Sequence, residues 1–209
     1  MKYILPDLPY KYNFLEPYID SETMEIHHQK HHQNYVNKTN IILKNFPNNL
    51  RNISIEELIK NIHKFPKNKS NDLINNAGGH INHTIYWQIL KKNTKIQENI
   101  RNAIEKDFLG MENFKKLFED NAMKHFGSGW TWLIFSKLTK KLSIVSTANQ
   151  DNPLMKNKDS IDYGYPIFCI DLWEHAYYLK YRNAKLEYIK SFWSILNWEE
   201  AERRYCIAK

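Results

Sequence analysis

The chain has 209 residues and a formal charge of +7, and it is long enough to bury a substantial core in one domain or two small ones. Its basic residues are interleaved with acidic ones, which argues against a nucleic-acid partner and leaves room for a small anionic substrate. No apolar run approaches the roughly 20 residues that span a bilayer, and no signal-peptide core is present. The two cysteines, Cys169 and Cys206, form no Cys-x-x-Cys motif. We therefore expect a cytoplasmic protein with no membrane partner.

The first half of the chain is predicted to be helical. Prolines and tyrosines up to residue 18 predict an extended arm, with no helix before Asp20. Asp20 or Ser21 can cap a long helix that continues into the forties, because acidic residues follow in its first turn. Residues 54–57, with the sequence Ser-Ile-Glu-Glu, have the pattern of a capping box that begins a shorter helix. A second long helix is predicted to carry residues 77–90.

The second half mixes helices with strands. Residues 94–97 (Thr-Lys-Ile-Gln) form another capping-box pattern, for a helix that should end near Gly110. Apolar residues at helical spacing then predict a helix with a core-facing side, formed by Phe114, Leu117, Phe118 and Ala122. Runs rich in β-branched and aromatic residues predict three short strands, at residues 130–135, 142–146 and 166–170. A late helix over residues 188–196 and a last one from Trp198 complete the pattern.

These elements predict an α+β fold in two parts. We expect an N-terminal hairpin of two long antiparallel helices over residues 1–93. A C-terminal α/β domain, with a three-stranded antiparallel sheet and several helices, should occupy residues 94–209.

Histidines are concentrated on the first long helix. Residues four apart share one face of a helix, so His27, His31 and Tyr35 form one stripe, and His28 and His32 form a second stripe about 100° away. Spacing does not decide which stripe faces inward. The alternative is a solvated histidine-rich face that binds metals adventitiously, although buried positions are expected on this helix at Met24, Ile26 and Val36.

The second long helix contains one further candidate ligand, His83, which lies four residues after Gly79 and four before Trp87. Two adjacent glycines, Gly78 and Gly79, each cost a helix about 1 kcal/mol relative to alanine. We therefore expect them to permit a close approach, either as open space on the His83 face or as a tight helix crossing.

The segment Asp171-Leu172-Trp173-Glu174-His175 follows the third predicted strand and leads into a helix. This position allows Asp171 and His175 to bind one metal ion, although a structural hydrogen-bonded pair would use the same two residue types. Three imidazoles and one carboxylate with an open solvent position are typical of a redox-active iron or manganese site. A carboxylate-bridged di-iron bundle is disfavoured, because Glu25-Ile26-His27-His28 is the chain's single Glu-x-x-His motif and such sites need two.

With these residues assembled, the sequence resembles the iron/manganese superoxide dismutase family, and specifically its manganese form. The resemblance covers essentially the whole chain and rests on segments that occur in a fixed order. They are residues 5–10 (LPDLPY), 24–32 (MEIHHQKHH), 75–83 (NNAGGHINH), 126–130 (FGSGW), 148–151 (ANQD) and 171–178 (DLWEHAYY).

The resemblance implies a mononuclear metal site with four protein ligands, His27, His83, Asp171 and His175, and solvent as the fifth. Superoxide would be converted there to dioxygen and hydrogen peroxide as the metal alternates between trivalent and divalent states. One manganese ion per subunit is expected, with iron as a possible substitute.

The resemblance also implies roles for residues around the metal. His31 and Tyr35 would line the substrate channel, and Gln150 would hydrogen-bond both the bound solvent and Tyr35. Apolar rings would wall the site, at Trp130, Trp132 and Trp173. In a homodimer, or a tetramer, Glu174 would reach His175 of the partner subunit, and Tyr178 would pair with His31 across the same interface.

Manganese is favoured over iron because Gly78 and Gly79 occur together with Gln150 on the loop after the second strand, whereas iron forms usually carry this glutamine on the Gly-Gly helix. One departure from the family pattern is Lys185-Leu186-Glu187, which stands where Arg-Pro-Asp is common. Two alternative functions are a metal-binding protein without turnover that uses exposed His28 and His32, and a mononuclear iron oxygenase, for which no cosubstrate-binding feature is found.

Overall fold

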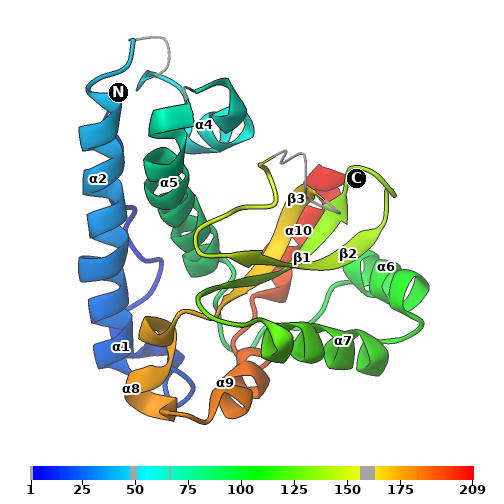
Figure 1. Cartoon of the computed structure of the whole chain (residues 1–209). Coiled ribbons are helices and arrows are strands. Elements are labelled where there is room, and N and C mark those ends of the chain that lie inside the picture. The colour runs from blue at the N-terminus through cyan, green and yellow to red at the C-terminus, as the bar shows by residue number, and fades with distance from the viewer. Residues whose placement is uncertain (1, 48–50, 66, 156–162) are drawn as a thin grey trace.

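The computed structural model describes residues 2–47, 51–65, 67–155 and 163–209. Figure 1 shows a helical hairpin beside a small twisted sheet that is covered by further helices. This arrangement confirms the predicted α+β class, with the hairpin from the first half of the chain and the antiparallel sheet from the second. The domain boundary near residue 93 stays a prediction. Among the described residues, no helix has the length and apolar character needed to cross a membrane.

The first long helix forms as expected and runs without a break in three segments. They are α1 (Ser21–Ile26), the π-helical η2 (His27–His32) and α2 (Gln33–Leu43). Asp20 caps it, because its side chain accepts a hydrogen bond from the Thr23 N–H at 2.8 Å. The wider π turn occupies the histidine-rich stretch itself, and such turns are frequent at functional sites. Met24 and Val36 face the core, but Ile26 is partly exposed, contrary to expectation.

The N-terminal arm is not wholly extended. A short 3₁₀ helix, η1 (Tyr12–Leu15), precedes the first long helix, so the prediction of no helix before Asp20 was wrong. Leu15 is completely buried, and burial of this side chain against the hairpin explains why the chain coils here despite its flanking prolines.

The second arm of the hairpin is α5 (Lys67–Gln88), which packs along α2. Before it lie α4 (Ile55–Lys60) and the 3₁₀ turn η3 (Ile62–Lys64). The Ser54 side chain accepts from the Glu57 N–H at 3.1 Å, as predicted, but the Glu57 carboxylate accepts from Asn61. Of the two hydrogen bonds of a capping box, the described residues therefore form the one from the Glu57 N–H to the Ser54 hydroxyl.

Two helices lead into the sheet: α6 (Glu98–Phe108) and α7 (Met111–Lys124). The capping box expected at residues 94–97 was wrong, because the Thr94 hydroxyl donates to the Leu196 carbonyl and α6 begins later. Helix α6 ends at Leu109 and Gly110, both with positive φ, as expected for a glycine stop. Phe114, Phe118 and Ala122 are buried in the core, but Leu117 is exposed.

The sheet has the strand order β2-β1-β3, and both pairings are antiparallel. The strands are β1 (Gly129–Ser136), β2 (Leu142–Ala148) and β3 (Gly164–Asp171). Trp130 pairs with Asp171 across the sheet, and Gly129 pairs with Ala148. The start of β1 and the ends of β2 and β3 therefore lie at the same end of the sheet, and Asp171 is located there.

The chain after β3 turns back toward the hairpin before it covers the sheet. Its elements are η4 (Glu174–Ala176), α8 (Tyr178–Tyr181), α9 (Lys185–Phe192) and α10 (Trp198–Ala208). Helix α10 packs along β3 and α7 packs across β1 and β2, while α5 touches β3 from the hairpin side. The junction between hairpin and sheet is thus filled by side chains from both halves.

Candidate metal centre

Four side chains from four separate elements converge at the junction of hairpin and sheet. The Asp171 Oδ2 atom lies 3.2 Å from His27 Nε2, 3.8 Å from His83 Nε2 and 3.5 Å from His175 Nε2. All four ligand atoms lie within 4.8 Å of one another. The first helix, α5, the end of β3 and η4 therefore bring together the four residues that sequence reasoning had selected.

Hydrogen bonds outside the centre orient two of these side chains. His83 Nδ1 lies 2.7 Å from the Gly79 carbonyl oxygen, which can only accept, so Nδ1 carries the proton and the Nε2 lone pair points to the centre. Asp171 Oδ1 accepts from the Trp173 N–H at 2.9 Å, which leaves Oδ2 free. Such outer contacts fix the tautomer and the aim of a metal ligand.

The four converging atoms have no hydrogen-bond partner although they are buried: His27 Nε2, His83 Nε2, His175 Nε2 and Asp171 Oδ2. Leaving a buried polar atom unpaired costs about 1–3 kcal/mol. Burial lowers the pKa of His27 and His83 well below the usual value, so both imidazoles are neutral. Four unpaired lone pairs at one buried point are what a cation requires.

The spacing of the four atoms also fits an ion. Ligand atoms bonded at about 2.0–2.2 Å to one ion stand about 3–4.4 Å apart, depending on the angle between them. The four ligand atoms here lie within 4.8 Å of one another, which is only slightly wider than this range. Imidazole together with a carboxylate suits iron and manganese, whereas a structural zinc site would use thiolates or a closed set of four ligands.

Gln150 lies beside the centre with its carboxamide fixed. Its Oε1 accepts from the Trp130 Nε1–H at 3.1 Å and from Asn82 Nδ2 at 3.0 Å. An indole N–H can only donate, so the Gln150 NH₂ group faces the other way and donates to the Tyr35 hydroxyl at 3.1 Å. Burial raises the pKa of Tyr35 to about 12, so its phenol is protonated at neutral pH.

The two glycines of α5 hold this arrangement together. A Cβ at Gly79 would lie 2.6 Å from the Tyr35 ring, and a Cβ at Gly78 would collide with the Gln150 carbonyl oxygen. The Gly79 side is therefore filled by Tyr35 instead of open, and the close-approach alternative explains both positions. Glycine here lets two elements from distant parts of the sequence touch α5.

Aromatic rings surround the ligands. Trp130 stands edge-on to His83 with ring centroids 5.2 Å apart, and Trp173 stacks with His175 at 5.6 Å. Trp132 packs on Trp130 at 5.7 Å, one ring further out. Sequence reasoning gave no role to Trp87, whose ring lies 4.8 Å from that of His27.

Asn82 was also missed by sequence reasoning. Its side chain donates to Gln150 and accepts from Asn152 at 2.7 Å. Trp87 could have been found from its spacing, because it lies four residues after His83. Nothing in the sequence pattern marks Asn82, since its partners lie about seventy residues away.

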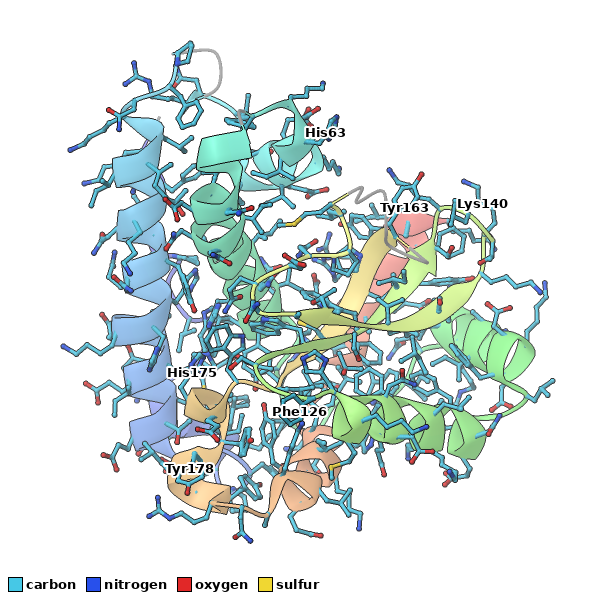
Figure 2. All side chains as sticks on the ribbon, in the orientation of Figure 1. His63, Phe126, Lys140, Tyr163, His175 and Tyr178 are labelled. Atoms are coloured by element: carbon cyan, nitrogen blue, oxygen red, sulfur yellow. The ribbon has the colours of Figure 1, made fainter. Side chains whose placement is uncertain are left out.

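The remaining predicted site residues lie on the outer side of the centre. His31 stacks on His175 with centroids 4.1 Å apart, and burial lowers the pKa of His31 to about 4, with a further contribution from His175. Glu174 and Tyr178 are exposed on the segment after β3, and Figure 2 shows Tyr178 below His175 at the edge of the molecule. A single chain therefore leaves both side chains turned to solvent.

The second histidine stripe is not a solvated face. His28 and His32 are buried, and both are hydrogen-bonded. His28 lies 3.1 Å from the Tyr12 hydroxyl, while the Trp87 Nε1–H donates to His32 Nδ1 at 2.9 Å and His32 Nε2 contacts His80 Nδ1 at 2.8 Å. The alternative function that required an exposed His28 and His32 is therefore contradicted.

Comparison with protein families matches two models along the chain. Residues 2–91 match the alpha-hairpin domain of iron/manganese superoxide dismutases, and residues 96–204 match their C-terminal domain. The chain belongs to the iron/manganese superoxide dismutase family. Curated relatives in this family include proteins named superoxide dismutase (Mn). That of Buchnera aphidicola subsp. Acyrthosiphon pisum is 54% identical over 98% of each chain, and that of Escherichia coli K12 is 50% identical over the full length of both.

Within this family pattern, Lys185 takes the place where arginine is common. The Lys185 ammonium donates to the His125 carbonyl at 3.2 Å, and burial lowers the pKa of this lysine. Together with Trp173, Glu174 and His175 it lines a cavity of about 340 Å³ next to the centre. The positive charge is kept, but the planar fork of arginine is lost.

Proposed function

We propose that this protein is a manganese superoxide dismutase, which converts two superoxide ions and two protons to dioxygen and hydrogen peroxide. The observation that carries the proposal is the convergence of four unpaired, buried ligand atoms in a chain of this family. His27, His83, Asp171 and His175 would hold one ion. When bound, manganese supplies one-electron redox chemistry between its trivalent and divalent states.

Tyr35 and Gln150 are proposed to manage the protons that the reaction consumes. The Gln150 amide holds the Tyr35 hydroxyl through a donated hydrogen bond, so the phenolic proton stays free to point elsewhere. The raised pKa of Tyr35, about 12, keeps that proton in place until a stronger base forms nearby. Peroxide dianion is such a base.

Substrate access is proposed to run past His31 and Tyr35, which lie on one stripe of the first helix. His31 is neutral because its pKa is lowered to about 4, so it adds no charge of its own at neutral pH. Attraction of the superoxide anion would then come from Lys185 and from the net positive charge of the chain. Trp130, Trp132 and Trp173 would exclude bulk water.

Manganese is proposed over iron for two reasons. Gly78 on α5 leaves room for the Gln150 carbonyl oxygen, so the glutamine comes from the loop after β2 and not from α5. The relatives at 50–54% identity are named for manganese. Iron remains the substitute that the same donor set accepts.

A homodimer is proposed to complete each site, with a tetramer as the larger alternative. Glu174 and Tyr178 are exposed beside His175 and His31, and apolar side chains accompany them: Phe126 is fully exposed and Leu179 is 41% exposed. Covering such residues is favourable. Light scattering of the purified protein tests this, and a monomer in both wild type and Glu174→Ala would contradict it.

The cellular location and the domain division are also proposals. Both cysteines are free, Cys169 in the core and Cys206 at the surface, which fits a reducing cytoplasm where the enzyme would protect against superoxide. The boundary at residues 93 and 94 lies between α5 and α6.

The deciding experiment measures bound metals and superoxide removal on one untagged preparation. Metal-free protein is then reloaded with manganese or iron separately. We expect activity with manganese, and Asp171→Asn should abolish both binding and activity. Asp151→Asn is the matched control, because Asp151 is another half-buried carboxylate near Gln150 that does not join the four-atom group. Inactivity with both metals would refute the proposal.

A further inference from the structure

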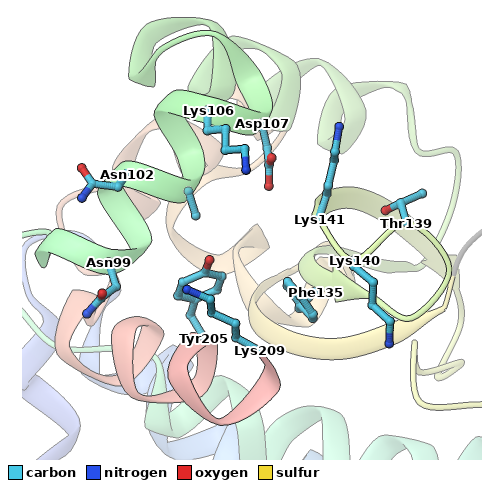
Figure 3. A pocket seen from close by; sticks show the side chains of 11 residues that line it. Asn99, Asn102, Lys106, Asp107, Phe135, Thr139, Lys140, Lys141, Tyr205 and Lys209 are labelled. Atoms are coloured by element: carbon cyan, nitrogen blue, oxygen red, sulfur yellow. The ribbon is translucent and has the colours of Figure 1, made fainter.

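A second polar cavity lies on the opposite side of the sheet from the hairpin. It has a volume of about 390 Å³ and is bounded by α6, by the turn between β1 and β2, and by the end of α10 (Figure 3). Four lysines line it: Lys106, Lys140, Lys141 and Lys209. Asp107 supplies the one carboxylate side chain among its lining residues.

Among the described residues, these four lysines carry their charge without a paired acid. Some lysines elsewhere do have an acidic partner, as in Lys91 with Glu199 at 2.7 Å and Lys116 with Asp120 at 2.7 Å. Within the described part of the chain, none of the four cavity lysines forms an ion pair. Gathering unpaired like charges is unfavourable unless an anion offsets them.

The scaffold that presents the lysines is fixed by hydrogen bonds. The Ser136 N–H donates to the Lys141 carbonyl at 2.8 Å and the Lys140 N–H donates to the Ser136 carbonyl at 3.1 Å, which closes the turn. Asp107 Oδ2 accepts from the Leu142 N–H at 2.9 Å and so ties this turn to α6. The carboxylate therefore has a structural partner.

Two aromatic rings and two amides complete the lining. Tyr205 and Phe135 form its inner wall, with ring centroids 6.1 Å apart (Figure 3). Asn102 on α6 is exposed at the rim of the cavity, and Asn99 donates to Glu202. Glu202 is itself held by the Ile100 N–H at 2.8 Å and does not line the cavity.

We propose that this cavity binds a small phosphate-bearing anion with several negative charges, such as a di- or triphosphate group. Lysine ammonium groups bind phosphate as point charges, and the volume falls in the range of small-ligand pockets, about 300–1,000 Å³. The four lysines come from α6, the β1–β2 turn and the end of α10 and line one cavity instead of following a stripe, which favours a compact anion over a nucleic-acid backbone. The site is separate from the metal centre, because none of its lining residues is a candidate ligand and α6 lies at the edge of the molecule away from the hairpin (Figure 1).

The test is isothermal titration calorimetry of the full-length, metal-loaded protein at low salt, with inorganic tripolyphosphate and with ATP. We expect binding at one site per chain. Lys106→Gln with Lys140→Gln should weaken it about tenfold, since each exposed charge pair contributes modestly. Lys38→Gln with Lys124→Gln removes two exposed lysines outside the cavity and should change it less than twofold.

Asp107→Asn should change the affinity for the anion in the opposite direction. The amide oxygen can still accept from the Leu142 N–H, but one negative charge is gone, so binding should tighten severalfold. Bound manganese and the midpoint of chemical denaturation should stay at the wild-type level in all these variants, which verifies their folding. Tighter binding of ATP than of tripolyphosphate would identify a nucleotide; equal binding would identify the phosphate chain alone as the ligand.

Three results would overturn the proposal. The first is no binding of either anion at millimolar concentration. The second is an equal loss of affinity in the two double lysine variants. The third is tighter binding of a DNA duplex that depends on the same cavity lysines. Each can occur whether or not the metal centre is active, so failure here is distinguishable from failure of the proposed dismutase function.

Discussion

Two stripes of the same helical segment use the same residue type for different purposes. His27 on the first stripe is buried with an unpaired Nε2 that points at Asp171. His28 and His32 on the second stripe are equally buried, but their ring nitrogens contact Tyr12, Trp87 and neighbouring groups. Burial therefore does not distinguish a ligand from a structural histidine, whereas an unpaired lone pair does.

The two stripes are also coupled. His32 on the second stripe stacks near the ring of His83 at 5.4 Å and is held by Trp87, whose ring also faces His27. The hydrogen-bonded stripe thus positions rings that back the candidate ligands. Substitutions on the two stripes test this difference in role.

The largest effect is expected for His27→Ala, which removes a proposed ligand. Bound manganese and superoxide removal should fall by at least about a hundredfold, since even outer contacts of a metal site are worth about 10–100-fold. Metal analysis and the activity assay measure this. His28→Ala is the control from the second stripe and should keep its metal; loss of metal in both variants would erase the comparison.

The free energy of unfolding should fall by about 3 kcal/mol on acidification because of His80, which pairs with His32. Burial lowers the pKa of His80 from 6.5 to about 4. The native state therefore binds fewer protons than the unfolded state below pH 6.5, so stability is complete above that pH and is lost as the pH falls toward 4. Denaturant unfolding of the metal-loaded protein between these pH values measures the loss.

His80→Gln keeps an acceptor for His32 but removes the titrating group. Its free energy of unfolding should depend less steeply on pH than that of the wild type, and metal release at acid pH is common to both proteins. Parallel pH profiles in the two proteins would show that His80 does not cause the loss.

Gln150→His is expected to have an intermediate effect. The carboxamide that donates to the Tyr35 hydroxyl is lost, while all four candidate ligands remain. Activity should fall about 10–100-fold with metal content retained, and the reduction potential of the bound metal should shift. An unchanged potential, measured by redox titration, would remove Gln150 from its proposed role.

The smallest effect is expected for Tyr12→Phe on the second stripe. It deletes the hydroxyl 3.1 Å from His28 Nδ1, and a partly buried hydrogen bond contributes about 1 kcal/mol. Chemical denaturation should show this loss, while manganese content and activity stay unchanged. A drop in metal content would mean that the second stripe helps to hold the ion directly.

The sequence was a sufficient guide to the elements and to the candidate residues. Periodicity and capping residues predicted the long helices, because the apolar spacing and the Asp20 and Ser54 caps act within a few residues. Sequence reasoning failed where a distant partner decides the contact. The Thr94 hydroxyl donates to the Leu196 carbonyl and accepts from the Trp198 N–H at the start of α10, so it does not cap α6. Leu117 is exposed because the sheet meets the adjacent face of α7.

By itself, the sequence determined the order of helices and strands, the segments that resemble the family, and the identity of the four candidate ligands. Only the tertiary structure decided which histidine stripe meets Asp171, because spacing places residues on a helix face but does not aim that face. It also decided that Asn82 orients Gln150 and that unpaired lysines from distant segments share one cavity. These are contacts between residues far apart in the chain, and no local pattern encodes them.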